Sequence, residues 1–179
     1  MKWSWNELRQ AGANPIQFET TLDVQDNLKA RQADIIAVSS AEVKGMFSVD
    51  ELGVLGYMRV KVKVTLPSTR SLKPADVCLD FDLTEHYVSR HDQDLSRFED
   101  TDVVIVLDDD ILDLNSVVED NILLQIPMQV LTADEQREDA ILPSGNDWNV
   151  VYEDQLKDQQ EKQVDPRLAK LKDLFSDSE

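Results

Sequence analysis

The sequence predicts an α+β fold built on a predominantly antiparallel β-sheet, a meander or a partly open barrel, with a few short helices. Two stretches alternate strictly between apolar and polar residues, 58–66 and 77–83, as expected for half-buried strands. Only a loop, 67–74, separates them, and the helical patterns elsewhere are short. Strands that follow one another without intervening helices pair as hairpins, so the order favours antiparallel pairing over βαβ units.

The N-terminal half contains the other early elements. Ser4 and Glu7 have the spacing of a capping box, which predicts a short helical turn. Residues 16–23 alternate, with Ile16, Phe18, Thr20 and Leu22 on one face, and predict a strand. A short helix is expected over 24–32 with Leu28 facing the core, and one or two strands over 35–49, bent at Gly45.

The second half contains one clear helix. Residues 90–102 are polar and predict a loop, and 103–107 form a short apolar strand. From 114 to 124 apolar residues recur at helical spacing, which places Val117, Val118 and Leu124 in the core; Asp113 or Ser116 caps this helix and Pro127 ends it.

The C-terminal region is expected to be separate from this domain. We expect a single domain over 1–152, with a last strand at 149–152, followed by a polar linker. Asp165 and Pro166 have the pattern of a helix start, and a helix over 165–175 would place four apolar residues on one face. This helix packs on the domain or extends from it.

The charge is large and uneven. The net charge of the 179 residues is −18. Residues 1–89 hold ten basic and twelve acidic residues, whereas 90–179 hold eight and twenty-four. Such a field attracts basic partners and repels bare phosphate backbones, although acidity also serves solubility alone.

The composition also bears on the compartment. The 41% of apolar residues are enough for a core, yet no run of about 18 predicts a membrane span. The N-terminus lacks the pattern of a signal peptide, and the single cysteine, Cys78, fits a reducing compartment. We therefore expect a cytoplasmic protein that does not contact a membrane.

No catalytic or metal motif stands out. There is no nucleophile elbow, phosphate-binding loop or dinucleotide-binding glycine pattern. Cys78, His86 and His91 lack the spacing of zinc ligands. Asp108, Asp110 and the residues after them fail the calcium-loop pattern, which requires glycine at its sixth position. We predict no enzyme activity, no cofactor and no metal.

The one basic cluster gives the candidate binding residues. Arg59, Lys61 and Lys63 share the polar face of one strand, and Arg70 and Lys73 lie in the next loop. Such a cluster could contact RNA phosphates. The alternative, which we favour, is that its charges protect an edge strand from aggregation.

Several stretches, taken in order, are similar to one family. They are the opening segment 3–8, the loop 65–74, the proline-terminated helix 113–127, the segment 145–148 and the Asp-Pro-Arg-Leu helix start at 165–168. Together they resemble the YceD family of bacterial large-ribosomal-RNA accumulation proteins. The resemblance implies a role in accumulation of 23S ribosomal RNA, and so in biogenesis of the large subunit, without a known catalytic activity. Many members carry cysteines that suggest a metal site, but this chain keeps only Cys78.

These observations leave two functional hypotheses. The first is a non-catalytic factor that binds a basic ribosomal protein, an assembly factor or ribosomal RNA, with Arg59, Lys61, Lys63, Arg70, Lys73 and Arg167 as candidate partner-binding residues. Arg167 gains nothing from the helix dipole at its helix start, so an internal or external partner is expected for it. The second is a metal-dependent RNA-processing enzyme that uses clustered aspartates such as Asp108 and Asp110. A homodimer formed through sheet edges is compatible with either.

Overall fold

The computed structural model describes the chain except for residues 12–13, 51, 92–94, 138–143, 148–149 and 151–179. It divides into two compact units, Met1–Asp134 and Glu135–Glu179. The first unit contains every helix and strand described below. Of the predicted strand at 149–152 only Val150 is described, and it is not in a strand; the predicted C-terminal helix and Arg167 lie outside the described residues.

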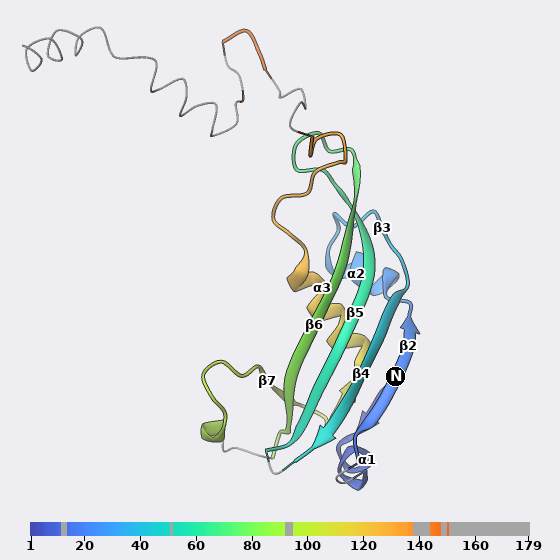
Figure 1. Cartoon of the computed structure of the whole chain (residues 1–179), viewed down its shortest axis with the longest axis vertical. Helices are drawn as coiled ribbons and strands as arrows, with labels where there is room; N and C mark the ends of the chain where they lie inside the picture. Colours follow the sequence, from blue (N-terminus) through green and yellow to red (C-terminus); the bar gives the residue numbers. More distant parts are fainter. Residues whose placement is uncertain (12–13, 51, 92–94, 138–143, 148–149, 151–179) are drawn as a thin grey trace, which may run out of the picture. The chain divides into compact units, whose positions relative to one another are not determined.

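The first unit is built on a six-stranded open sheet (Figure 1). Its strands are β2 (Ile16–Leu22), β3 (Ala37–Val38), β4 (Ala41–Val49), β5 (Val54–Pro67), β6 (Pro74–Ser89) and β7 (Val104–Leu107). The order is β2-β4-β5-β6-β7, with β3 paired to the far end of β5. All pairs are antiparallel except β6 with β7, which is parallel. The predicted α+β class with a predominantly antiparallel sheet is confirmed, and the sheet is not closed into a barrel.

A second, two-stranded sheet joins the N-terminus to the segment before the last helix. Its strands are β1 (Lys2–Ser4) and β8 (Ile111–Asp113), which pair antiparallel. This pairing joins residues more than a hundred positions apart and was not predicted. It is extended by a hydrogen bond of 2.9 Å from the Leu114 amide to the Met1 carbonyl.

The two longest strands form the centre of the main sheet. Along β5, Met58, Val60 and Val64 are fully buried, while Arg59 and the two following lysines are exposed, as the alternation predicts. However, β5 pairs with β4 on one side and with β6 along its whole length on the other. The prediction that its charges protect an edge strand is therefore wrong, because β5 is a central strand.

Two helices lie against one face of this sheet, α2 (Gln25–Arg31) and α3 (Leu114–Gln125), as Figure 1 shows behind the strands. Leu28 of α2 is fully buried, as predicted, and Leu114, Val118 and Ile122 of α3 join the same core. A short 3₁₀ helix, η1 (Leu95–Arg97), lies in the loop before β7.

One residue of the predicted α3 core stripe is misplaced. Leu124 is 80% exposed, so its predicted place in the core is wrong. The buried stripe follows four-residue steps from Leu114 to Ile122, and a residue two positions further on points to a different side of the helix. Val117 is partly buried against the core and Val118 is buried, as expected.

The helix starts follow the sequence signals. The Ser4 hydroxyl accepts a hydrogen bond from the Glu7 amide at 3.3 Å, and the Glu7 carboxylate accepts one from the Ser4 amide at 2.8 Å. This capping box opens α1 (Trp5–Gln10). Asp113 caps α3 by accepting a hydrogen bond of 3.2 Å from the Asn115 amide, so of the two predicted caps it is Asp113 rather than Ser116.

Candidate interaction surface

The face of the main sheet opposite α2 and α3 carries the candidate basic residues. The register of β5 and β6 places Arg59 opposite Asp82, Lys61 opposite Asp80, and Lys63 opposite Cys78. The polar residues of both strands are exposed on this face. The structure therefore brings three of the predicted site residues together, but beside a row of aspartates.

Those cations are held in ion pairs. The Arg59 guanidinium donates two hydrogen bonds to the Asp80 carboxylate, at 2.8 and 3.1 Å, in a bidentate geometry. The Lys61 ammonium lies 3.4 Å from the same carboxylate, and the Lys63 ammonium lies 3.3 Å from Asp76. On the neighbouring strands Lys44 pairs with Glu19 at 2.7 Å. The charges on this face therefore compensate one another.

The pKa shifts on this face have the same origin. The hydrogen bond from Arg59 lowers the pKa of the Asp80 carboxyl, and the reciprocal contact raises the pKa of Arg59. The pKa of the Asp76 carboxyl is lowered by a hydrogen bond from the Thr65 hydroxyl, followed by one from Lys63. Both carboxylates are thus ionised at neutral pH, and this part of the sheet does not present a surplus of positive charge.

Beside the ion pairs lies a shallow depression of about 520 Å³. Met46, Tyr57 and Arg59 contribute to its lining, and the first two side chains are 39% and 43% exposed. Tyrosine, methionine and arginine are residue types that protein–protein interfaces favour. The face therefore combines compensated charges with exposed apolar groups.

The remaining basic candidates lie elsewhere. Arg70 and Lys73 belong to the turn between β5 and β6, at the end of the hairpin rather than in the row of β5 cations. The buried Ser68 organises this turn, since its hydroxyl accepts hydrogen bonds from the Arg70 and Ser71 amides at 3.1 and 3.3 Å. The structure thus does not unite the predicted cluster into one patch.

Releasing the β5 cations from their carboxylate partners should increase the affinity of this face for RNA. We expect the double variant Asp76→Asn, Asp80→Asn to bind a single-stranded RNA oligonucleotide several-fold more tightly than the native chain at low salt, because the β5 cations lose their carboxylate partners. Fluorescence anisotropy measures this change. Asp108→Asn with Asp109→Asn, which changes the net charge equally at two exposed aspartates outside this face, is the control. Equal RNA affinity in the native chain and the β6 variant would contradict the proposed charge compensation.

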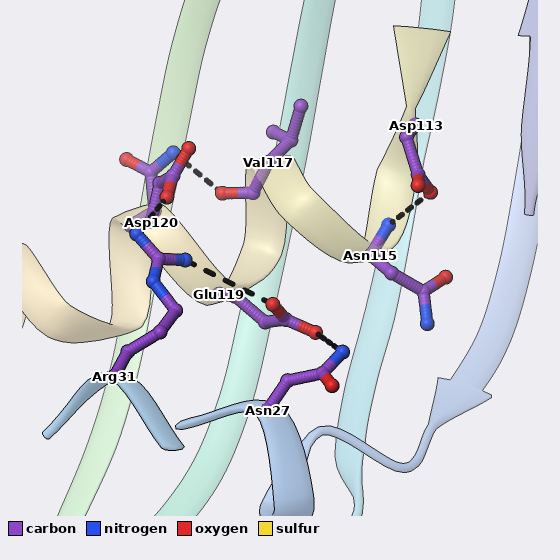
Figure 2. A network of polar contacts seen from close by, with 8 residues as sticks. Asn27, Arg31, Asp113, Asn115, Val117, Glu119 and Asp120 are labelled. Atoms are coloured by element: carbon purple, nitrogen blue, oxygen red, sulfur yellow. Dashed lines mark hydrogen bonds and ion pairs between the residues drawn. The ribbon is translucent and has the colours of Figure 1, made fainter. Parts of the chain in front are cut away.

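The α3 segment that carries the family resemblance holds a polar network against α2 (Figure 2). Glu119 is 5% exposed and accepts a hydrogen bond of 2.8 Å from the Asn27 side chain, and the Arg31 guanidinium lies 3.8 Å from its other oxygen. Arg31 also bonds Asp120 at 2.5 Å. Figure 2 shows the α2 side chains reaching toward α3 at these points. This network joins α2 to α3, so Glu119, which belongs to the proline-terminated helix segment, has a structural role.

A second buried carboxylate joins α3 to the sheet. Glu85 of β6 is 7% exposed. Its carboxylate accepts a hydrogen bond of 2.7 Å from the side-chain amide of Asn121 and one of 2.6 Å from the Tyr87 hydroxyl. Asn121 also donates to the Val117 carbonyl at 3.0 Å. Neither Glu85 nor Tyr87 stood out in the sequence. The sequence pattern that could have identified them is the alternation of β6, because both residues continue the series of inward-facing positions from Val77 to Leu83.

Tyr87 makes the stability of the fold pH-dependent. Burial, and then the bond to Glu85, raise the pKa of its hydroxyl far above the ordinary 10.0. Above about pH 10 the Tyr87 hydroxyl loses its proton in the unfolded chain but keeps it in the folded chain. The contribution of Tyr87 to the free energy of unfolding is therefore complete below that pH. Above it, the contribution decreases by about 1.4 kcal/mol per pH unit.

The variant Tyr87→Phe isolates this effect. At about pH 8 we expect a loss of about 2 kcal/mol in the free energy of unfolding, because the buried Glu85 carboxylate loses a donor. Above about pH 10 the gap between the two proteins should narrow, since only the native chain loses the tyrosine contribution. Urea titrations across that range measure the gap, and a gap independent of pH would contradict this assignment.

The aspartates of the alternative hypothesis lie in the turn between β7 and β8. Asp110 has a positive φ of 55°, and its carboxylate accepts a hydrogen bond of 2.6 Å from the Ser89 hydroxyl. In the part of the chain that the structure describes, no three His, Cys, Asp or Glu side chains are grouped to hold a metal ion. The turn is tied to the end of β6 by this bond and by Arg90, which donates to the Asp108 carbonyl at 3.0 Å.

The described fold is that of an α+β protein with an open, one-sided sheet. Residues 57–175 match the family described as large ribosomal RNA subunit accumulation protein YceD, and the chain belongs to this family. A curated relative, an uncharacterized protein called YlbN from Bacillus subtilis (strain 168), is 33% identical over 175 residues, covering 98% of this chain and 96% of the relative. No solved structure matches. Within the described residues, no helix is long and apolar enough to cross a membrane.

Proposed function

We propose that this protein supports accumulation of the ribosomal RNA of the large subunit by binding a basic ribosomal protein or assembly factor, without catalysing a reaction. Membership of the YceD family supports the ribosomal destination. The family description names an accumulation role rather than a reaction, which supports a binding protein over an enzyme. A role in ribosome assembly would also be consistent with the expected cytoplasmic location.

The pairing of the β5 cations is the observation that favours a protein partner over RNA. Phosphate backbones bind to uncompensated positive charge, and their affinity grows with the number of cations they contact. Here Arg59 and Lys61 share the Asp80 carboxylate, and Lys63 faces Asp76. With a net charge of −18, the chain as a whole attracts a basic surface and repels RNA.

Deletion of the gene tests the ribosomal role. We expect the ratio of large-subunit to small-subunit ribosomal RNA to fall in the deletion strain and to return when the native chain is supplied. The double variant Asp76→Asn, Asp80→Asn is supplied to the deletion strain in the same way, because it alters the charge of the sheet face and leaves the core unchanged. An unchanged ratio after deletion would remove the proposed function.

A further inference from the structure

The strand β7 lies at one end of the main sheet. It pairs with β6 alone, in parallel, with His86 beside Val104 and Ser89 beside Leu107. Among the described residues no other strand pairs with it. With respect to this part of the chain, its other edge is available for main-chain hydrogen bonds.

This edge is apolar and exposed. Val103, Ile105 and Val106 are 51%, 39% and 43% exposed, and they include residues from both faces of the strand. Soluble proteins usually protect edge strands with charged residues, proline, a bulge or a covering segment. The segment from Val103 to Leu107 has no charge and no proline. The opposite edge strand, β2, differs because its polar residues alternate with apolar ones that pack on the core.

The backbone direction of β7 follows from its register. The His86 amide donates a hydrogen bond of 2.8 Å to the Val103 carbonyl. Since backbone polar groups alternate in direction along a strand, those of Val103 and Ile105 face β6, and those of Val104 and Val106 face away from it. Val104 and Val106 thus present two amides and two carbonyls to a further strand.

Carboxylates lie at both ends of this edge. Asp100 and Asp102 precede β7, Asp108 and Asp109 follow it, and all four are exposed. A second copy of the chain pairing antiparallel with β7 would bring Asp102 of one copy beside Asp108 or Asp109 of the other. Like charges placed opposite each other destabilise strand pairs, so the ends of β7 disfavour a homodimer through this edge.

We infer that β7 is a docking edge for an extended segment of a partner protein that carries basic residues at both ends of a short apolar core. The segment adds a strand to the sheet through Val104 and Val106, its apolar side chains cover Ile105 and Val106, and its lysines or arginines reach the aspartates at either end. This inference rests on the proposed function for the basic character of the partner, and it adds the surface and the conformation that is bound.

A synthetic peptide tests the edge directly. The probe has two lysines at each end of an alternating valine–threonine core, and the control peptide has glutamates in place of the lysines. Fluorescence anisotropy with the full chain at low salt should show binding of the basic peptide and an affinity for the acidic one at least about tenfold weaker. Equal binding of the two peptides, or no binding of the basic one, would overturn the inference.

Matched variants locate the binding. Val106→Lys should weaken the binding of the basic peptide at least about tenfold. Ile36 has the same exposed fraction of 43%, and the control Ile36→Lys should leave the affinity for the peptide unchanged. Asp108→Asn with Asp109→Asn should weaken binding several-fold and reduce its salt dependence, in contrast to Glu19→Gln with Glu42→Gln. Circular dichroism establishes that each variant is folded.

The outcomes separate this inference from the proposed function. Native affinity in Val106→Lys, or a native dimer in sedimentation that Val106→Lys dissociates, would show that β7 is not the docking edge for a basic partner. The deletion experiment would be unaffected by either result. Conversely, an unchanged ribosomal RNA ratio would remove the ribosomal role and leave the peptide measurement valid.

Discussion

Replacing Gly45 by valine is expected to lower the free energy of unfolding by about 3 kcal/mol, a large part of the stability of a domain of this size. A Cβ atom at this position would lie 2.5 Å from the backbone carbonyl oxygen of Tyr57 and 2.7 Å from Cγ of Met58. The backbone oxygen belongs to β5, the central strand, so it cannot move aside without disturbing the ladder. The glycine therefore marks a close approach inside the sheet.

Urea denaturation of the native chain, Gly45→Val and the control Lys44→Val measures this effect. Lys44 is the preceding residue on the same strand, and its side chain lies on the exposed face. Valine is well suited to that position, so the control should lose far less stability than Gly45→Val. Similar stability in all three proteins would show that the space around Gly45 is larger than the structure indicates.

Asn121→Leu is expected to lower the free energy of unfolding by about 2 kcal/mol. Leucine is nearly the same size but has no amide, so the buried Glu85 carboxylate would keep only the Tyr87 hydroxyl as a donor. Removing one partner of a buried charged group leaves the cost of its desolvation uncompensated.

The matched variant is Glu85→Gln, which removes the charge and keeps the shape. The double variant with Asn121→Leu should lose less free energy of unfolding than the sum of the losses in the two single variants. The reason is that a neutral side-chain amide at position 85 is less costly to leave without the Asn121 donor than a carboxylate is. Thermal or urea unfolding of the four proteins gives the coupling free energy. Strict additivity would mean that Asn121 acts on stability through packing alone.

The strands that the sequence predicted well are those with a strict local pattern. The alternation of β5 and β6 determines which side chains are buried regardless of which strands pair. Pairing itself depends on contacts between distant residues, and this is why the interpretation of β5 as an edge strand failed and the β1–β8 pair was missed. Leu124 was misplaced for a related reason, since only tertiary packing decides which side of α3 faces the sheet.

The sequence predicted the basic residues of the candidate site but not the electrostatics of that site. Arg59, Lys61 and Lys63 do share one exposed face, as their spacing indicated. Their neutralisation by Asp76 and Asp80 depends on the register between two strands, which no single-strand pattern contains. The buried Glu85 was detectable from its inward phase, but its partner Asn121 comes from a helix 36 residues away.

Purification of the tagged chain from cells, with and without ribonuclease, tests most directly the claim that a basic protein is the partner. The proposed function predicts that ribosomal proteins or assembly factors co-purify at low salt, remain bound after the RNA is digested, and dissociate as the salt concentration rises. Release of all ribosomal proteins by ribonuclease at low salt would contradict it, because RNA would then be the direct contact.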